Sequence, residues 1–518
     1  MRGTSWLIPL AILGVAAILY VSSWGVAVTH DSVLYLSAGE NLSQGLGMQR
    51  AGPNGELRPI AHYPPLYPML LAALLLLGMD EVHAATWLSA VLFGVNIGIA
   101  GMIVLWLTRR LHGALLAQFA ILVSPVMLET HLNALSEPLF FTWLLLNLWL
   151  LAMYLETQRR PLLIAAGVAC SLASLSRYVG GALGGAGIVI LALRRRTPIK
   201  RRLEDVAILA GVSLCPLLLW YVRNLILAGS SANRALVYHP VSYLVLRAAF
   251  DTLSGRLLPE QLSLRIRAVL LLAIVSCAGF LVAWGLAGLR RTGCSHPEEA
   301  ESVRRCLRWG WISSLFIVTY IAVVGFSLAF LDASTRIDDR ILSPIYLVLV
   351  ICALGFASVL ARPARLIGTA FCVLLVGIYA IRSWPPLADI RLNGRGFNSR
   401  EWLSSETAEL VRGLEPDATI ISNESLAVEF LIGRPVYGVP EAVDSVTGTQ
   451  RSDLGSQLTE MRHLLEEPGA VLVVFTGYHY RVEMPPMGQL TEGLVQVAAT
   501  ADGLVFVDER NAGTWGTR

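Results

Sequence analysis

Two carboxylates in this sequence could take part in chemistry, because each lies beside a long apolar run. Asp31 follows the apolar residues 6–28, and Glu137 directly precedes Pro138 at the start of the apolar residues 138–155. A carboxylate in such a place can act as a general base and remove a proton from an attacking hydroxyl or amine. Structural roles are also open, since Asp31 can cap the helix that follows and Glu137 can stabilise a helix N-terminus.

Other polar residues near the apolar runs could bind an anionic group such as phosphate. Arginine binds phosphate through two parallel hydrogen bonds, and His and Tyr can each donate one. The candidates are His62, Tyr63, Arg177, Tyr178, Arg223, Arg336 and Arg340. Tyr63 has an alternative place in an aromatic belt at the membrane interface. For the arginines, the alternatives are contact with lipid headgroups, as at Arg177 and Arg223, or a local ion pair with aspartate, as at Arg340.

The sequence contains none of the common motifs that bind nucleotides or catalytic metals. A P-loop, a GxSxG turn, an HExxH helix and paired cysteines with metal-ligand spacing are all missing, which argues against a nucleotide-driven pump or a zinc protease. A divalent metal shared by Asp31 and Glu137 stays open as a cofactor hypothesis, although two carboxylates without a set of histidines do not define such a site.

These residues must be positioned by membrane helices, because the composition is that of an integral membrane protein. The 518-residue chain is 55% hydrophobic and 15% charged, with a mean hydropathy of +0.61, beyond the usual range of soluble domains. Runs close to the roughly 20 residues that cross a bilayer predict eleven transmembrane helices. They cover residues 6–28, 84–108, 113–130, 138–155, 161–176, 178–193, 204–228, 268–289, 309–330, 341–361 and 365–382. The shorter apolar stretch 66–78 predicts an interfacial or re-entrant helix.

The arginines indicate how these helices are oriented. With 66–78 left out of the count, the arginine clusters fall on one side; they are Arg2, 109–110, 159–160, 194–202, 290–308 and 362–365. Cytoplasmic loops are enriched in Arg and Lys, so the N-terminus is predicted inside and the C-terminus outside, with the protein in the cell inner (plasma) membrane. The candidate residues then lie in outer segments or at the outer ends of spans. These segments are 29–83, 131–137, 229–267 and 331–340.

The chain changes character after its last apolar run. Residues 1–384 form the predicted transmembrane module, and residues 385–396 predict a turn-rich linker. Residues 397–518 predict a small extracytoplasmic α/β domain, with helices at 399–414 and 452–467 and buried strands at 418–423 and 470–477. The predicted fold class is a polytopic α-helical membrane protein of about eleven transmembrane helices with a C-terminal α/β domain.

Five short motifs, taken in order, resemble one known family. They are DSVLYLSAGENL from Asp31, HYPPLYP from His62, ALSEPLF around Glu137, SRYVG around Arg177 and DDRILSPIYLVL around Arg340. Over roughly residues 6–382 the chain resembles bacterial glycosyltransferases of the GT-C fold, family 39 type, related to the protein O-mannosyltransferases and the lipid A aminoarabinose transferases. It departs from the protein O-mannosyltransferases, which pair Asp with Glu, because His30 and Ser32 flank Asp31.

This resemblance implies sugar transfer from a polyprenyl-phosphate carrier to an acceptor glycan, lipid or protein on the extracytoplasmic side, with inversion at the anomeric carbon. It assigns catalysis to Asp31, organisation of the site to Glu137, and the carrier phosphate to Arg177 and Arg340. The expected partners are the polyprenyl-phosphate sugar donor, the acceptor and the lipid bilayer, and not nucleic acid.

Two other classes of function stay open from the sequence alone. In a transporter or flippase of a lipid-linked or anionic substrate, the same charges would line a path across the membrane, but the sequence shows neither inverted repeats nor paired broken helices. In a membrane anchor, the chain would only present residues 397–518, and their removal would abolish all function.

Overall fold

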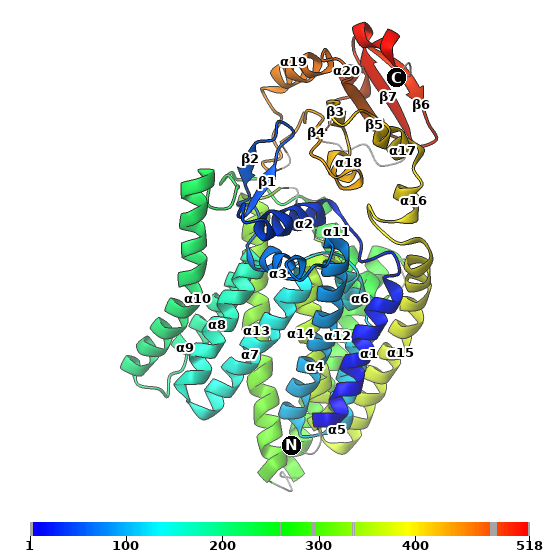
Figure 1. Ribbon diagram of the computed structural model, residues 1–518. Helices are drawn as coiled ribbons and strands as arrows, with labels where there is room; N and C mark the ends of the chain where they lie inside the picture. Colours follow the sequence, from blue (N-terminus) through cyan, green and yellow to red (C-terminus); the bar gives the residue numbers. More distant parts are fainter. Residues whose placement is uncertain are drawn as a thin grey trace.

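In the computed structural model, long helices form a layer and a small α/β region lies on one end of it (Figure 1). The structure describes residues 4–258, 261–292, 297–333, 335, 337–444, 446–476 and 484–515. The helices of the layer are α1 (Ile8–Val21), α4 (Glu81–Thr108), α5 (Leu111–Leu122), α6 (Pro125–His131), α7 (Glu137–Thr157), α8 (Arg160–Ser176), α9 (Gly181–Ala192), α10 (Ile199–Ala228), α12 (Leu264–Thr292), α13 (Pro297–Phe330), α14 (Asp339–Val359) and α15 (Arg362–Asn393). Each predicted span coincides with one of these helices when α5 and α6 are counted together.

Helix length alone gives a smaller number of spans than the predicted eleven. Among the described residues, eight helices are long and apolar enough to cross a membrane, and α5 with α6, bent by 59°, make a ninth if the pair is one span. The predicted spans 161–176 and 178–193 correspond to the shorter helices α8 and α9. The backbone is extended at Arg177 and turns at η2 (Tyr178–Gly180), which breaks this apolar run. The polytopic helical class is confirmed.

Small and polar residues fix the packing at the centre of the layer. A Cβ at Gly94 of α4 would lie 2.7 Å from the Ala11 carbonyl oxygen, so glycine is needed where α4 meets α1. Small residues at helix contacts are typical of membrane proteins. The Asn96 side chain donates to the Pro138 carbonyl (2.9 Å) and accepts from Thr142 (2.8 Å), which joins α4 to α7.

The two ends of the helical layer differ in what they carry. At one end, which we call the arginine face, arginines of several predicted clusters meet acids of other helices: Arg109 with Glu298, Arg110 with Glu299, Arg160 with Glu204, and Arg305 with Glu156. The opposite end, which we call the α/β face, carries the C-terminal region (Figure 1). Arginines that the sequence assigned to one side of a membrane therefore gather at one end of the layer.

Short elements lie at the α/β face. α2 (His30–Ser43) and α3 (Leu66–Leu75) lie across the ends of the long helices (Figure 1), and the hairpin of β1 (Gln49–Ala51) and β2 (Leu57–Pro59) connects them. A further helix, α11 (Tyr243–Leu257), precedes α12. The short helix predicted at 66–78 is α3, with ten residues.

The C-terminal region has a five-stranded mixed sheet in the order β4-β3-β5-β7-β6. Its strands are β3 (Ile420–Ser422), β4 (Tyr437–Gly438), β5 (Val471–Phe475), β6 (Leu494–Ala499) and β7 (Gly503–Asp508), and its helices are α16 (Arg400–Leu403), α17 (Glu406–Arg412), α18 (Ser425–Ile432), α19 (Leu454–Leu465), α20 (Met487–Leu490) and η3 (Glu509–Thr514). β3 pairs in parallel with β4 and β5, whereas β7 pairs antiparallel with β5 and β6. The predicted strands are β3 and β5, and the second predicted helix is α19.

Two local predictions in this part of the chain were wrong. The helix predicted at 399–414 is split into α16 and α17, because the Ser405 side chain caps α17 by accepting from the Ala408 N–H (3.0 Å). The predicted linker 385–396 is mostly helical, since α15 continues through Pro385 and Pro386 to Asn393. Prolines normally interrupt a helix, but the following turns pack their apolar side chains against the core of the layer.

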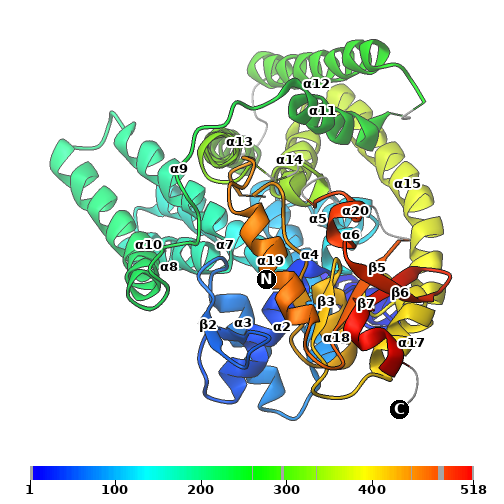
Figure 2. The ribbon, with the colours of Figure 1, turned by 90° about the horizontal axis from the view of Figure 1, so that it is seen from above.

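The start of the C-terminal region clamps the segment between α1 and α2. The Phe397 N–H donates to the Val28 carbonyl (2.8 Å), and Asn398 accepts from the Val28 N–H (3.0 Å) while it donates to the Val26 carbonyl (3.0 Å). Seen from above, the C-terminal region lies over α2, while α8 to α10 extend beyond it (Figure 2). Residues 370 positions apart in sequence thus fix the backbone that leads into α2.

Candidate functional site

Four charged residues from distant parts of the chain form one ion network at the α/β face. Arg340 lies between two carboxylates: its Nη1 donates to Asp31 (2.6 Å) and its Nε donates to Glu137. Arg177 also pairs with Glu137. Glu137 is buried, with 1% of the residue exposed, and a buried carboxylate needs such compensation. The fold therefore brings together four residues that the sequence predicted separately.

Helix ends place each member of this network. Asp31 lies in the first turn of α2, Glu137 is the first residue of α7, and Arg340 lies in the first turn of α14. Arg177 lies at the break between α8 and η2. The N-cap residue of α2 is Thr29, so Asp31 is not the capping residue that the sequence left open. Its carboxylate is directed to other elements instead.

Tyr63 completes the surroundings of Asp31. Its hydroxyl donates to Asp31 Oδ1 (2.7 Å). Burial alone would raise the pKa of Asp31, but the Arg340 guanidinium and the Tyr63 hydroxyl outweigh burial and hold this pKa below its ordinary value. Burial and the nearby Asp31 charge raise the pKa of Tyr63, which keeps its phenol protonated as the donor. Asp31 is thus an ionised carboxylate at neutral pH.

A second polar cluster begins at the other edge of Tyr63. The His62 ring lies edge-on to the Tyr63 ring, with centroids 4.7 Å apart, and His62 Nε2 accepts from Arg234 (3.4 Å). Arg234 also pairs with Asp332. Burial and the charge of Arg234 lower the pKa of His62, so its imidazole is neutral at pH 7. This cluster combines a neutral acceptor, a guanidinium and a carboxylate within reach of the Asp31 site.

Tyr178 and Arg223 hold the loop that carries this cluster. The Tyr178 hydroxyl donates to the Ala61 carbonyl (2.8 Å), directly before His62. Arg223 donates to the Ile60 carbonyl (3.4 Å) in the same loop. Both residues, which the sequence proposed as substrate-binding, therefore contact the protein backbone beside the second cluster.

Sequence reasoning overlooked Arg234. This arginine lies in the predicted outer segment 229–267 and so departs from the positive-inside pattern, which is the same signal that pointed to Arg177. Arg336, which the sequence did propose, lies outside the described residues.

The two carboxylates of the ion network do not fit a shared metal. The Arg340 guanidinium donates to both Asp31 and Glu137 and takes the place that a bridging cation would need. Across the described ranges, no group of three or more His, Cys, Asp or Glu side chains could hold a metal ion. The side chains present therefore do not support the metal hypothesis.

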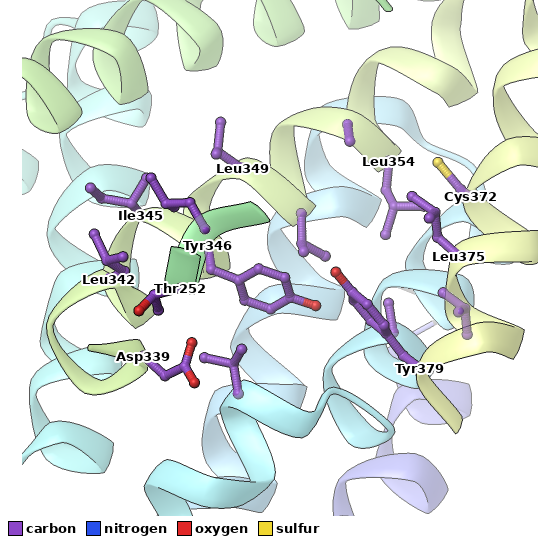
Figure 3. Close-up of a pocket in the computed structure, with 16 residues that line it drawn as sticks. Thr252, Asp339, Leu342, Ile345, Tyr346, Leu349, Leu354, Cys372, Leu375 and Tyr379 are labelled. Carbon is purple, nitrogen blue, oxygen red and sulfur yellow. The ribbon is translucent and has the colours of Figure 1, made fainter. Parts of the chain in front are cut away.

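One cavity adjoins the network and a second lies next to that cavity, and both have a size common for ligand sites, which is about 300–1,000 Å³. The first, which we call the acid pocket, has a volume of about 370 Å³; its charged lining residues are Asp31, Glu129, Asp338, Asp339, Arg340 and Arg395. The second, which we call the apolar pocket, has a volume of about 310 Å³ and lies mainly between α14 and α15 (Figure 3). Asp339 lines both cavities.

Comparison with known proteins defines the architecture. The crystal structure of ArnT from Cupriavidus metallidurans bound to undecaprenyl phosphate superposes with a TM-score of 0.57 at 15% identity, over 97% of this chain and 98% of that one. The chain has the GT-C fold. The archaeal oligosaccharyltransferase AglB from Archaeoglobus fulgidus, in complex with an inhibitory peptide and a dolichol-phosphate, also matches this GT-C chain, with a TM-score of 0.50 and 12% identity over 91% of this chain and 69% of that one. The mycobacterial arabinofuranosyltransferase AftD matches with a TM-score of 0.51 and 14% identity over 98% of this chain and 42% of that one.

Sequence comparison adds a relation to one family. Residues 62–220 of the GT-C chain match the family model described as dolichyl-phosphate-mannose-protein mannosyltransferase, which confirms the relation to protein O-mannosyltransferases. No curated protein sequence matches the chain. The matched range includes Glu137 and Arg177 but neither Asp31 nor Arg340, so the roles of those two residues depend on the geometry.

Proposed function

We propose that this protein is a membrane glycosyltransferase that moves a sugar from a polyprenyl-phosphate carrier to an acceptor. One observation carries the proposal: on a GT-C scaffold, Arg340 and Tyr63 hold Asp31 as an ionised carboxylate that lines the acid pocket. The matched structures of ArnT and AglB contain undecaprenyl phosphate and a dolichol-phosphate, which supports a donor of this chemistry.

The proposal places the α/β face outside the cytoplasm. The arginine face collects the arginine clusters, as cytoplasmic ends of membrane helices do. The N-terminus is then cytoplasmic, the C-terminal region is extracytoplasmic, and the protein lies in the inner (plasma) membrane of its cell.

In this mechanism Asp31 is the general base. The acceptor oxygen or nitrogen attacks the anomeric carbon, and its proton passes to Asp31. The bond from that carbon to the phosphate oxygen breaks, and the carrier phosphate leaves with the bonding electrons. Attack opposite the leaving group inverts the anomeric centre. A phosphate ester leaves without prior protonation, so one base suffices, and such a base contributes about 10²–10⁴-fold to the rate.

The donor phosphate has two sets of candidate arginines. Arg177 and Arg340 belong to the ion network, where two carboxylates balance them. Arg234 of the second cluster and Arg223 beside that cluster have one carboxylate, Asp332, among their described partners, which favours an added anion. We therefore assign the phosphate to the second cluster with its histidine and tyrosine neighbours. The network arginines then hold the two carboxylates in position.

Release of polyprenyl phosphate from a radiolabelled polyprenyl-phosphate sugar, by purified protein in lipid, tests the proposal. Asp31→Asn should keep donor binding and lose about 10²–10⁴-fold of the turnover. Arg234→Gln should weaken donor binding about tenfold, the usual size of one charge-assisted contact. Arg109→Gln, at the arginine face, is the matched control and should change neither quantity. Full turnover in Asp31→Asn would remove the base assignment.

Sealed vesicles separate transfer from transport. A transporter or flippase would move the labelled donor across the bilayer with its sugar–phosphate bond intact, whereas a glycosyltransferase breaks that bond. Movement of intact donor without release of carrier phosphate would overturn the proposal.

A further inference from the structure

The apolar pocket and the acid pocket follow one another along the same two helices. Asp339, the first residue of α14, lines both. α6 also contributes to both, with Val126 in the apolar pocket and Glu129, nearly one turn later, in the acid pocket. The apolar pocket lies among the long helices, and the acid pocket lies at the α/β face. The two pockets are therefore neighbours that share the lining residue Asp339.

The apolar pocket has the chemistry of a site for a hydrocarbon chain. Leu, Ile, Val and Ala side chains of α14 and α15 make up half of its lining residues. Tyr346 and Tyr379 also line it, and their rings are neighbours with centroids 6.1 Å apart (Figure 3). Asp339 lies at one end, where the acid pocket begins, and Leu354 lies near the other end. The described wall includes no arginine or lysine that could pair with a phosphate.

Among the described residues, carboxylates outnumber guanidinium groups in the wall of the acid pocket. Its wall includes four carboxylates and two guanidinium groups. Both guanidinium groups are already paired, Arg340 with Asp31 and Arg395 with Glu129 (3.1 Å). A phosphate headgroup would be repelled here, whereas a hydroxyl or an amine would find hydrogen-bond acceptors.

Asp31 stands between this cavity and the cationic cluster. One of its oxygens accepts from Tyr63, whose ring contacts His62, and the other accepts from Arg340 in the wall of the acid pocket. His62 and Arg234 are in the wall of neither pocket. The donor phosphate therefore fits one side of Asp31, and the acid pocket is left for the second substrate.

We propose that the acceptor is an amphipathic molecule whose apolar chain lies in the apolar pocket. Its head is neutral or cationic, lies in the acid pocket, and presents the reacting hydroxyl or amine to Asp31. The inference rests on the proposed function and adds the class of acceptor: a lipid-linked sugar or amine, not a protein and not a phosphate-headed lipid. The proton of the head group passes to Asp31 as the new bond to the anomeric carbon forms, and the carrier phosphate leaves from the opposite side.

Photolabelling tests this site without requiring turnover. The probe is dodecyl glucoside with a diazirine in its alkyl chain, added to full-length protein in lipid vesicles. We expect labelled peptides from α14 and α15, and competition by excess unlabelled dodecyl glucoside. Ala353→Trp, at an exposed position in the wall of the apolar pocket, should fill the pocket and remove most of this labelling. Ala370→Trp, at an exposed α15 position outside that wall, is the matched control and should leave it unchanged.

Two competitors decide the identity of the occupant. Dodecyl phosphate has the same chain with an anionic head and should compete about fivefold less well than dodecyl glucoside, as expected for a nearby unit charge at a protein surface. Asp339→Asn removes one negative charge and should therefore reduce the difference in competition between dodecyl phosphate and dodecyl glucoside. Equal competition by dodecyl phosphate would overturn the inference. Protection by polyprenyl phosphate at lower concentration than dodecyl glucoside would also overturn it, because the pocket would then hold the donor chain.

Donor turnover measured in the same vesicles distinguishes failure of the acceptor site from failure of the glycosyltransferase proposal. Turnover without specific labelling of α14 and α15 would overturn the acceptor site and leave the glycosyltransferase proposal standing. Labelling that competes as expected, in a protein that transports intact donor, would support the amphiphile site and overturn the transfer reaction.

Discussion

Two aspartates at opposite faces of the helical layer are held by the same kinds of partner. Each accepts a hydrogen bond from a tyrosine hydroxyl and another from an arginine. The partners are Tyr63 and Arg340 for Asp31, and Tyr154 and Arg194 for Asp205. Both arrangements join separate parts of the chain, and both give a carboxylate in apolar surroundings a guanidinium and a hydroxyl as donors.

The two aspartates differ in access. The Asp31 side chain is 31% exposed and lines the acid pocket. The Asp205 side chain is 0% exposed and lies in the wall of neither pocket described above. The same hydrogen-bond donors, a tyrosine and an arginine, therefore do not distinguish a reactive carboxylate from a structural one. The open space beside the carboxylate does.

The largest expected difference is between Asp31→Asn and Asp205→Asn. Asp31→Asn removes the base and should lower turnover about 10²–10⁴-fold with little change in thermal stability. Asp205→Asn leaves Arg194 without its buried counter-charge and should cost about 3–5 kcal/mol of stability, while turnover per folded molecule stays the same. Donor turnover and thermal unfolding in lipid, measured on both variants, check this. A turnover defect in folded Asp205→Asn would break the comparison.

The next effect concerns the arginine partners. Arg340→Lys keeps the charge, but a single ammonium cannot reproduce the fork that joins Asp31 to Glu137, and we expect kcat to fall about 10²-fold through misplacement of the base. Arg194→Lys should change thermal stability and leave kcat unchanged. Measuring kcat and the KM for the donor separately in both variants checks this prediction. If Arg340→Lys raised the donor KM at constant kcat, Arg340 would instead bind the phosphate, as the sequence first suggested.

A smaller effect is expected for the tyrosine partners. Tyr63→Phe removes a hydrogen bond to ionised Asp31, so the pKa of Asp31 should rise, with Arg340 and burial unchanged. Turnover falls as pH drops through this pKa, because the base must be unprotonated. The acid limb of kcat/KM should therefore move to higher pH in Tyr63→Phe, while turnover near neutral pH changes little because Asp31 stays ionised there. Tyr154→Phe should leave the limb in place, and a shift in that variant would count against the comparison.

The smallest expected effect lies at the contact between α2 and the C-terminal region. His30 Nε2 lies 2.9 Å from Glu424, and the ring packs edge-on against Phe397. This pair is partly exposed, so His30→Ala should cost about 1 kcal/mol or less. His83→Ala, which removes an exposed pair with Asp80, should cost less still. Thermal unfolding and limited proteolysis of the C-terminal region measure both, and equal sensitivity would show that the His30 contact does not hold that region.

Charge and hydropathy predicted the helical class and the face at which the candidate residues lie. The preference of a segment for the membrane, or for one side of it, depends mainly on the residues of that segment, so it can be predicted from the sequence. Asp31, Glu137, Arg177 and Arg340 were found for this reason, since each is an ionisable residue at the end of an apolar run. Their mutual contacts were not predicted, because ion pairs between helices depend on how the helices pack.

The same limit explains the errors. The prolines after residue 384 predict a linker from local preference, yet tertiary packing extends α15 through them. For Arg223, which the sequence proposed as a substrate ligand, only the fold shows the contact with the backbone of the loop before His62. Arg234 was missed although it breaks the positive-inside pattern, and only the fold shows that it meets His62.

The hydrogen bonds at Val26 and Val28 make the segment that leads into α2 depend on the start of the C-terminal region. The backbone groups that lead into Asp31 find their partners at Phe397 and Asn398, so a chain cut before residue 396 loses the template for its own first loop. Deleting the C-terminal region therefore cannot tell an enzyme from a presenting scaffold. We therefore expect the residues directly after α15 to vary only together with the end of α1.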